Sequence, residues 1–252
     1  MKPILVIGES CKDVFQYGTV PRISPEAPCP VFVPTYKVIN DGMAANVYNN
    51  ILAFDKDLNV ELITNELKPV KTRFVEEKSN QMLLRVDEFD EVKPCDIYKI
   101  DLSKYGSAII SDYNKGYLSK DMIEHIGNSI PLTFLDTKKK MGIWDQNITF
   151  RKINQTEYEQ TKDSCNERNL IVTLGENGCR YNEIIYPVEE KVIGGDISGA
   201  GDTFLAALSY FYLLLGSIEE AIPYANKAAS IVVQHIGTYV LTEADVAKIL
   251  QD

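Results

Sequence analysis

The sequence predicts an α/β protein built on a doubly wound, mostly parallel sheet, with a second, smaller β subdomain. Short apolar runs of the kind that form buried strands recur at 3–8, 59–63, 107–111, 131–135 and 169–174. Segments with helical spacing lie between several of them. Because strands that are apolar on both faces must be covered on both sides, this alternation indicates a parallel sheet between two layers of helices.

The first strand is expected at 3–8, PILVIG, an apolar run that ends at a glycine. The first helix is expected at 42–54, where GMAANVYNNILAF has helical spacing. Further helices are expected at 119–129, 155–165, 199–215, 218–235 and 242–251. Thr242 followed by Asp245 resembles a capping arrangement for the last of them.

Two segments depart from the alternation of strands and helices. Residues 15–39 are proline-rich and then strand-like, and residues 70–89 have the pattern of a hairpin with polar residues at its turn. Strands that contain prolines suit a sheet edge or a small separate sheet. We therefore expect these two segments to form a β subdomain that emerges from the α/β body.

Composition excludes several classes of protein. The 252 residues carry 36 acidic and 26 basic side chains, for a net charge of -10, and the longest basic cluster is Lys138–Lys140, so a nucleic-acid-binding surface is not expected. The apolar runs are too short to span a membrane. The five cysteines are scattered without a CxxC pair, which indicates free thiols and a cytoplasmic location.

The chain contains two histidines, His125 and His235, which argues against a zinc site and against Ser–His catalysis. His235 lies in an apolar helical run, where a packing or capping role is expected. If the protein is an enzyme, acid–base chemistry therefore falls on carboxylates or lysines.

The tetrapeptide Gly199-Ala200-Gly201-Asp202 stands directly before a long apolar helical segment. Glycines at a helix start allow backbone N–H groups to approach a ligand, and the helix dipole favours negative charge there. A carboxylate beside an anion site is unfavourable unless it has to take a proton, so this pattern suits phosphoryl transfer to an alcohol. Glycines and acidic residues are also common at ordinary helix starts, and no lysine follows as in the GxxxxGK[ST] loop.

The segment DISGAGD, 196–202, resembles the C-terminal signature of the PfkB/ribokinase carbohydrate kinases. Five further blocks are similar to the subfamily formed by the kinase domain of bacterial heptose 7-phosphate kinase/ADP-heptose synthase: RISPEAPCPV (22–31), AANVYNNILAF (44–54), QMLLRVD (81–87), IISDYNKGYL (109–118) and YANKAASIVVQHIGT (224–238). The resemblance covers nearly the whole kinase domain of that subfamily. It implies a single ribokinase-like domain over 1–252, with 15–39 and 70–89 as its β lid.

The resemblance also implies roles for individual residues. Asp202 would be the general base, and Gly199, Ala200 and Gly201 would form the anion hole. The sugar-binding residues would be Asp13, Gly42, Asn46, Lys71, Arg73 and Arg85. The residues on the nucleotide side would be Asn154, Thr173, Gly175, Gly178 and Asn226, with Asn154 and Glu157 organising Mg²⁺.

Each of these residues also has an ordinary structural interpretation. Asn154 and Glu157 have the pattern of an N-cap and a first-turn acid. The TLGENG segment is equally a strand–turn–strand hairpin, and Asn226 a polar residue on a helix face. Asp13 fits a loop acid, and the three basic residues fit a solvated surface.

The sequence also departs from the family pattern. Met43 stands where the family has a glycine, so the sugar pocket is expected to be narrowed or reshaped. DTKK at 136–139 replaces DPKG and retains Lys138, and KIN replaces TPN before the magnesium motif. One βα unit of the family pattern is absent after the strand NVELIT, and no nucleotidyltransferase segment follows Asp252. A reduced sheet, and a chain that is not the bifunctional enzyme, are therefore expected.

The expected function is an ATP-dependent, Mg²⁺-assisted sugar kinase that acts on the anomeric hydroxyl of a heptose 7-phosphate or a similar sugar phosphate. Two alternatives stay open. One is a degenerate kinase fold retained for binding a sugar or nucleotide, and the other is a kinase for another alcohol such as fructose, ribose or a nucleoside. The apolar segment CPVFVPTYKVI is expected to pair with its copy in a homodimer formed through the lid.

Overall fold

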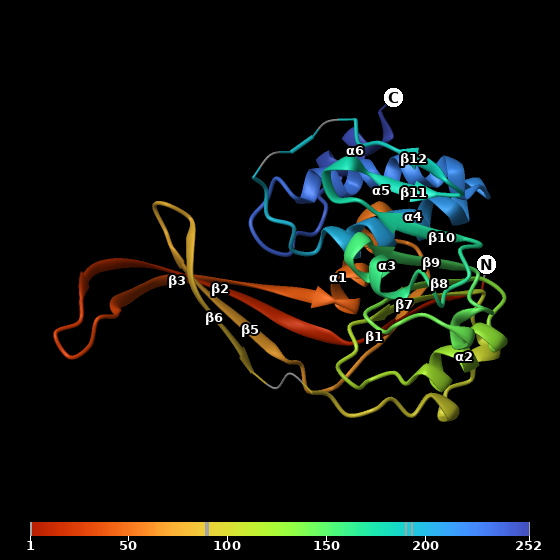
Figure 1. Cartoon of the computed structure of the whole chain (residues 1–252), viewed down its shortest axis with the longest axis horizontal. Coiled ribbons are helices and arrows are strands. Elements are labelled where there is room, and N and C mark those ends of the chain that lie inside the picture. The colour runs from red at the N-terminus through yellow and green to blue at the C-terminus, as the bar shows by residue number, and fades with distance from the viewer. Residues whose placement is uncertain (1, 89–90, 190, 193, 252) are drawn as a thin grey trace.

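The computed structural model describes residues 2–88, 91–189, 191–192 and 194–251. An α/β body holds both ends of the chain, and a long arm of strands projects from it (Figure 1). No helix in these residues is both long and apolar enough to cross a membrane.

The body contains an eight-stranded sheet with the order β12-β11-β10-β9-β8-β7-β1-β4. Its strands are β1 (Ile4–Gly8), β4 (Val60–Ile63), β7 (Ser107–Asp112), β8 (Thr133–Thr137), β9 (Phe150–Asn154), β10 (Leu170–Thr173), β11 (Cys179–Tyr181) and β12 (Ile184–Tyr186). The strands from β4 to β10 are parallel, and the last two are antiparallel. The predicted mostly parallel sheet is confirmed.

Strand β1 shows why the sheet is covered on both sides. Ile4 and Val6 point into a core shared with helices α1 (Ala44–Phe54), α4 (Ala200–Leu215) and α5 (Ile218–Val232). Leu5 and Ile7 point the opposite way, into a core that includes the buried face of α2 (Lys120–Ser129). Because successive residues of a strand face opposite sides, a fully apolar strand can exist only between two such layers.

The remaining helices also lie near their expected positions. Helix α3 (Gln155–Thr161) is shorter than the predicted 155–165, and α6 (Glu243–Leu250) begins with the expected capping box between Thr242 and Asp245. Helix α5 ends at Val232, and the ring of His235 stacks on Tyr239 with centroids 3.7 Å apart. The expectation that His235 packs is therefore confirmed.

The second sheet has the order β3-β2-β5-β6 and forms the projecting arm (Figure 1). Its strands are β2 (Ser10–Ile23), β3 (Pro30–Met43), β5 (Val70–Glu76) and β6 (Gln81–Glu88). The predicted hairpin corresponds to β5 and β6, with its expected last residue, 89, outside the described residues. The expected helix start at 42 is wrong, because Gly42 and Met43 pair with the beginning of β2 and so belong to β3.

The expected reduction of the sheet is visible at β4. This strand pairs with β1 on one side and is the last strand in the sheet order. The chain passes from it to β5 through residues 64–69, without a helix between the two strands. The first sheet therefore ends at β4, and the polypeptide enters the arm directly from that edge.

Candidate active site at the carboxyl edge of the sheet

The candidate residues gather where the sheet order reverses. From β1 the chain first adds β4 on one side and later adds β7 on the other. In open parallel sheets, such a reversal leaves a crevice at the carboxyl ends of the two strands, where ligands typically bind. Glu9 follows β1 and Tyr113 follows β7 at this point of the sheet.

Asp202 lies in the first turn of α4 and faces these strand ends. The Tyr113 hydroxyl donates to its Oδ1 atom at 2.7 Å, and the Asn46 amide donates to its Oδ2 atom at 3.3 Å. The side chain is 1% exposed. Both of its carboxylate oxygens accept hydrogen bonds, so the side chain is held in place at this edge.

The glycines before Asp202 shape the start of α4. Gly199 is the N-cap in the left-handed conformation, with φ of 78°, and no side chain caps the helix. A Cβ on Gly199 would lie 2.8 Å from the Asn46 amide nitrogen. Ala200 uses its own N–H for the Ile197 carbonyl at 3.2 Å, so it is the least available of the three predicted anion-hole residues. An N-terminal turn without a side-chain cap suits an anionic ligand.

The pKa of Asp202 is raised to about 6, mainly because burial penalises its charged form. The hydrogen bond from Tyr113 opposes this rise, and the nearby carboxylate of Asp136 adds to it. A carboxylate with this pKa is ionised at neutral pH and is basic enough to take a proton from an alcohol as the alcohol attacks.

A buried ion pair lies beside the glycines. Lys152 on β9 contacts Asp136 on β8 at 2.7 Å, and both side chains are buried. A Cβ on Gly201 would lie 2.9 Å from the Lys152 ammonium nitrogen. The change from TPN to KIN therefore puts a positive charge next to the start of α4. Lys138 lies near the same edge and pairs with Glu157.

The predicted sugar-binding residues range from buried (Asp13, Gly42, Asn46) through partly buried (Lys71, Arg73) to exposed (Arg85). Asp13 on β2 is buried and accepts from Arg73 at 2.5 Å, and a Cβ on Gly42 would lie 2.4 Å from the Asp13 carboxylate. Lys71 places its ammonium 5.9 Å from the ring centre of Tyr113. Arg85 on β6 instead pairs with its neighbour Asp87 on an exposed surface.

Met43 adopts φ of 62°, a left-handed value that costs a non-glycine residue backbone energy. Its side chain is buried. The structure therefore keeps a glycine-like backbone between β3 and α1 although methionine occupies the position. Asn46, in the first turn of α1, contacts Asp202 rather than lying open for a sugar.

Asn154 and Glu157 form a capping box for α3. The Asn154 side-chain oxygen Oδ1 accepts from the backbone N–H of Glu157 at 2.9 Å, and Glu157 Oε2 accepts from the backbone N–H of Asn154 at 2.8 Å. Within the described residues, no cluster of three acidic, histidine or cysteine side chains could hold a metal. Mg²⁺ is commonly held by one or two carboxylates together with substrate phosphates. Glu157 offers such a carboxylate, and because its Oε1 pairs with Lys138, an ion that arrives with a nucleotide would take the place of that ammonium.

The predicted nucleotide-side residues have structural contacts of their own. Thr173 ends β10, and Gly175 and Gly178 turn the chain into the antiparallel β11. A Cβ on Gly178 would lie 2.0 Å from the Tyr186 carbonyl oxygen, so only glycine fits there. Asn226 on α5 donates to that same carbonyl at 2.9 Å. These contacts position the turn, and a role for it in nucleotide binding stays a prediction.

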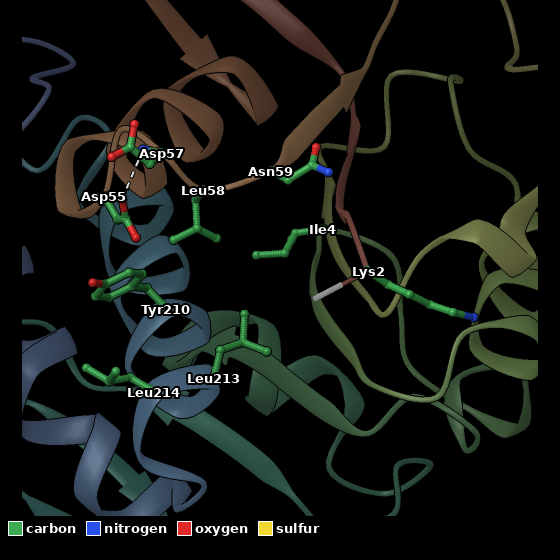
Figure 2. Close-up of a pocket in the computed structure, with 9 residues that line it drawn as sticks. All are labelled: Lys2, Ile4, Asp55, Asp57, Leu58, Asn59, Tyr210, Leu213 and Leu214. Atoms are coloured by element: carbon green, nitrogen blue, oxygen red, sulfur yellow. Dashed lines mark hydrogen bonds between the residues drawn. The ribbon is translucent and has the colours of Figure 1, made fainter.

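A separate cavity of about 360 Å³ lies at the other end of the sheet (Figure 2). Its lining includes Ile4 at the start of β1, Tyr210 and Leu213 from the C-terminal half of α4, and Asp55. These residues lie at the amino ends of the strands, whereas Asp202 lies at the N-terminus of α4 and near the carboxyl ends. The hollow is therefore distinct from the candidate active site.

Sequence reasoning did not assign roles to Glu9, Tyr113, Asp136 or Lys152. The IISDYNKGYL block contains Tyr113 and was a signal for it, but nothing in the local pattern indicates a contact with residue 202, 89 positions away. In the sequence, Lys152 stands out only as a departure from the family pattern. These contacts depend on which strands become neighbours, and a short motif does not contain that information.

The comparisons with known proteins bear on the family and the fold of the chain. The sequence model of one protein family, the pfkB family carbohydrate kinases, matches residues 146–245 of this chain. The chain is 29% identical over 297 residues to the bifunctional protein HldE of a Nitratiruptor species, covering 96% of this chain and 64% of that protein. The aligned length exceeds the 252 residues of this chain, so the relative has segments that this chain lacks.

Solved structures show the same fold. The crystal structure of ribokinase from Thermotoga maritima covers all of this chain with a TM-score of 0.72 at 15% identity, and all of that chain is matched in return. Arabidopsis thaliana ribokinase complexed with ribose and ATP gives a TM-score of 0.67 at 15% identity, covering 100% of this chain and 99% of that one. The predicted ribokinase-like fold is confirmed.

Proposed function

We propose that this chain is a carbohydrate kinase of the pfkB family and that it phosphorylates a hydroxyl of a sugar phosphate with Asp202 as the general base. The observation that carries the proposal is the placement of a buried, hydrogen-bonded carboxylate in the first turn of α4, at the carboxyl edge of the sheet. A carboxylate base beside uncapped helix amides is the arrangement that phosphoryl transfer to an alcohol needs.

The reaction requires one proton transfer and one exchange of bonds at phosphorus. The sugar hydroxyl gives its proton to Asp202 while its oxygen bonds to the γ-phosphorus of ATP, and the bond from that phosphorus to the bridging oxygen breaks to release ADP. Negative charge on the transferring group faces the first-turn amides of α4 and the Lys152 ammonium beside Gly201. These groups stabilise the transition state electrostatically.

ATP is the proposed phosphoryl donor, since Arabidopsis thaliana ribokinase of the same fold was solved with ribose and ATP. Asn154 and Glu157 would hold Mg²⁺ together with the nucleotide. When bound, the ion neutralises phosphate charge and draws the phosphate oxygens into one geometry. In the chain itself, the mutual cap between the two residues fixes the start of α3, and Lys138 contacts Glu157 there.

The proposed substrate is a heptose 7-phosphate or a sugar phosphate of similar shape, phosphorylated at the anomeric hydroxyl. The likeness to the bifunctional protein HldE supports this choice, although the chain spans 64% of that relative's length. Lys71, Arg73 and Arg85 on the arm are cations that suit a substrate phosphate. Asp13, fixed by Arg73, presents a carboxylate to sugar hydroxyls.

An ADP-release assay over a panel of sugars tests the proposal. The panel contains heptose 7-phosphates, free heptose, fructose, fructose 6-phosphate, ribose and a nucleoside. Turnover is expected with the heptose phosphates and not with free heptose, because only a phosphorylated sugar offers an anion to the cations of the arm. ATP binding without turnover of any sugar would support the binding-only alternative and overturn the proposal.

The reaction is expected to slow as the pH falls through about 6, because burial raises the pKa of Asp202 to about 6 and only the ionised form accepts a proton. Below that value, kcat/KM should fall about tenfold for each pH unit. Initial rates measured at constant ionic strength, from about pH 4.5 to 8.5, give the profile. A rate that stays constant down to the lower limit would contradict the assignment of Asp202.

We also propose that the arm is a lid that closes over the sugar and joins two copies of the chain. Large apolar side chains are exposed on its two outer strands, among them Tyr36, Ile39 and Leu84. Exposed apolar edge strands favour pairing with another chain. Closure of the lid would exclude water from the reacting phosphate.

Sedimentation equilibrium at micromolar concentration is expected to give twice the 28.3 kDa mass of the chain. Ile39→Lys should weaken the dimer by at least about tenfold, since it buries a charge in the contact. Ile143→Lys makes the same change on an exposed site of the body and serves as the control. A monomeric mass for the unmodified chain would exclude the dimer.

A further inference from the structure

We propose that Tyr113 is a positioning residue for Asp202. The Tyr113 phenol is a permanent hydrogen-bond donor to Oδ1 of Asp202 and leaves Oδ2 of Asp202 for the substrate hydroxyl. The inference rests on the proposed function, because it assigns the geometry of the base in that reaction. It adds a residue for which neither the sequence motifs nor the relatives' names give a role.

The two hydrogen bonds on Asp202 differ in length. The Tyr113 hydroxyl lies 2.7 Å from Oδ1, the distance of a strong bond from a hydroxyl to a carboxylate. The Asn46 amide lies 3.3 Å from Oδ2, at the long end of the range for a nitrogen donor. Oδ1 is therefore the firmly held oxygen, and Oδ2 is the one that a substrate hydroxyl can approach.

The loop that carries Tyr113 is anchored by a buried carboxylate. Glu9, which is 0% exposed, accepts from the Tyr113 amide at 2.8 Å through Oε2. Its Oε1 accepts from the amides of Lys115 at 3.0 Å and Tyr117 at 3.1 Å. One side chain at the end of β1 thus fixes three backbone amides of the loop after β7.

A second carboxylate holds the beginning of the same loop. Asp112 accepts from the Thr137 hydroxyl, from the Lys139 ammonium at 2.6 Å and from the Asn114 amide at 3.2 Å. With an anchor on each side, the backbone of Tyr113 has little freedom. The phenol therefore reaches Asp202 from a backbone that is held in place, as a positioning group requires.

The phenol stays protonated in this environment. Burial, followed by the charge of Asp202, raises the pKa of Tyr113 well above its ordinary value. Two ammonium groups lie near the ring, with Lys71 5.9 Å and Lys138 5.6 Å from its centre, and burial and the charge of Asp202 outweigh their opposing effect on the phenol. A neutral phenol that keeps its proton can donate to Asp202 but cannot compete with it as a base.

Other groups also influence the charge of Asp202. They are Asp136 on β8, Lys152 on β9, Lys138 after β8 and Cys11 on β2. Asp136 and Lys152 form a pair and act in opposite directions on Asp202, and the raised pKa of Cys11 keeps it a neutral thiol. Removing the Tyr113 hydroxyl leaves all of them in place, so the resulting change can be assigned to one hydrogen bond.

The test replaces Tyr113 by phenylalanine, which keeps the ring near the two ammonium groups and removes only the donor. The pKa of Asp202 is read from the carboxyl ¹³C signals of aspartate-labelled protein, with D202N used to assign its resonance. We expect the pKa to rise by about one pH unit in Y113F. Y117F removes a phenol that belongs to the same loop and does not contact Asp202. The pKa of Asp202 in Y117F should therefore match its pKa in the unmodified chain.

Kinetics decides whether the contact persists in the substrate complex. The acidic limbs of kcat/KM and of kcat should both move upward in Y113F, because the first reports the free enzyme and the second the complex. An unchanged Asp202 titration would overturn the inference. A shift in the acidic limb of kcat/KM without one in that of kcat would also overturn it, because the phenol would then have left Asp202 when the substrate bound. Absence of turnover by the unmodified chain would refute the proposed function instead, and the titration would still measure the Tyr113 contact.

Discussion

Replacing Asp202 by asparagine is expected to reduce kcat for sugar phosphorylation by about 10²- to 10⁴-fold while the fold is retained. The amide has nearly the same volume, and its oxygen can still accept from the Tyr113 hydroxyl at 2.7 Å, whereas its NH₂ replaces the acceptor of the longer 3.3 Å bond from Asn46. It cannot accept the proton of the attacking hydroxyl. Steady-state ADP release with saturating ATP and sugar phosphate measures the loss.

The same substitution should make the protein more stable at neutral pH. The pKa of Asp202 is raised from 3.8 to about 6 in the folded chain, so protonated Asp202 favours folding, and this contribution is lost as the pH rises through about 6. A pKa shift of that size corresponds to about 3 kcal/mol of free energy of unfolding. D202N should be more stable by about this amount above pH 6, where Asp202 is charged, and should show no gain below pH 4, where Asp202 is protonated. Urea unfolding at the two pH values tests this sign.

Asp57→Asn is the matched control. Asp57 is an exposed aspartate on the loop before β4, and it lines the cavity beside the C-terminal half of α4 rather than its first turn (Figure 2). Its replacement should change neither kcat nor the pH dependence of unfolding. Unaltered turnover in D202N would remove Asp202 from the chemistry, and equal stability of D202N and the unmodified chain at both pH values would contradict its raised pKa.

The fold could be predicted largely because its signals are local. The run PILVIG is apolar at every position from Pro3 to Ile7, and only a strand covered on both sides accommodates that pattern. Thr242 and Asp245 cap α6 as their spacing indicates, because a capping box involves residues of one turn. The end of α3 at Thr161 was missed because the polar residues after it give no clear stop signal.

The site could be predicted only in part, because its contacts join distant segments. The glycines before Asp202 indicate a helix start with open amides from sequence alone. Tyr113 reaches Asp202 only once β7 and α4 pack together, and Glu9 reaches Tyr113 over 104 positions. Asn154 and Glu157 illustrate the opposite case, in which a functional motif and an ordinary capping box use the same residues.

Replacing Glu9 by glutamine is expected to destabilise the fold by about 2 to 4 kcal/mol. The two carboxylate oxygens together accept hydrogen bonds from three backbone N–H groups, and all three hydrogen bonds go to a charged acceptor. A glutamine amide keeps one oxygen and turns an NH₂ group towards at least one N–H donor, which then stays buried without a partner. Denaturant unfolding monitored by circular dichroism gives the free energy of unfolding.

The loss in E9Q should extend to catalysis, because the loop that it loosens carries Tyr113. Glu243→Gln makes the same chemical change in an exposed ion pair with Lys56 and should leave the free energy of unfolding nearly unchanged, because water screens that pair. Amide hydrogen exchange of Tyr113, Lys115 and Tyr117 should accelerate in E9Q and stay unchanged in E243Q. If E9Q unfolds at the same denaturant concentration as the unmodified chain, Glu9 does not anchor the loop, and the rigid placement of the Tyr113 phenol against Asp202 loses its structural basis.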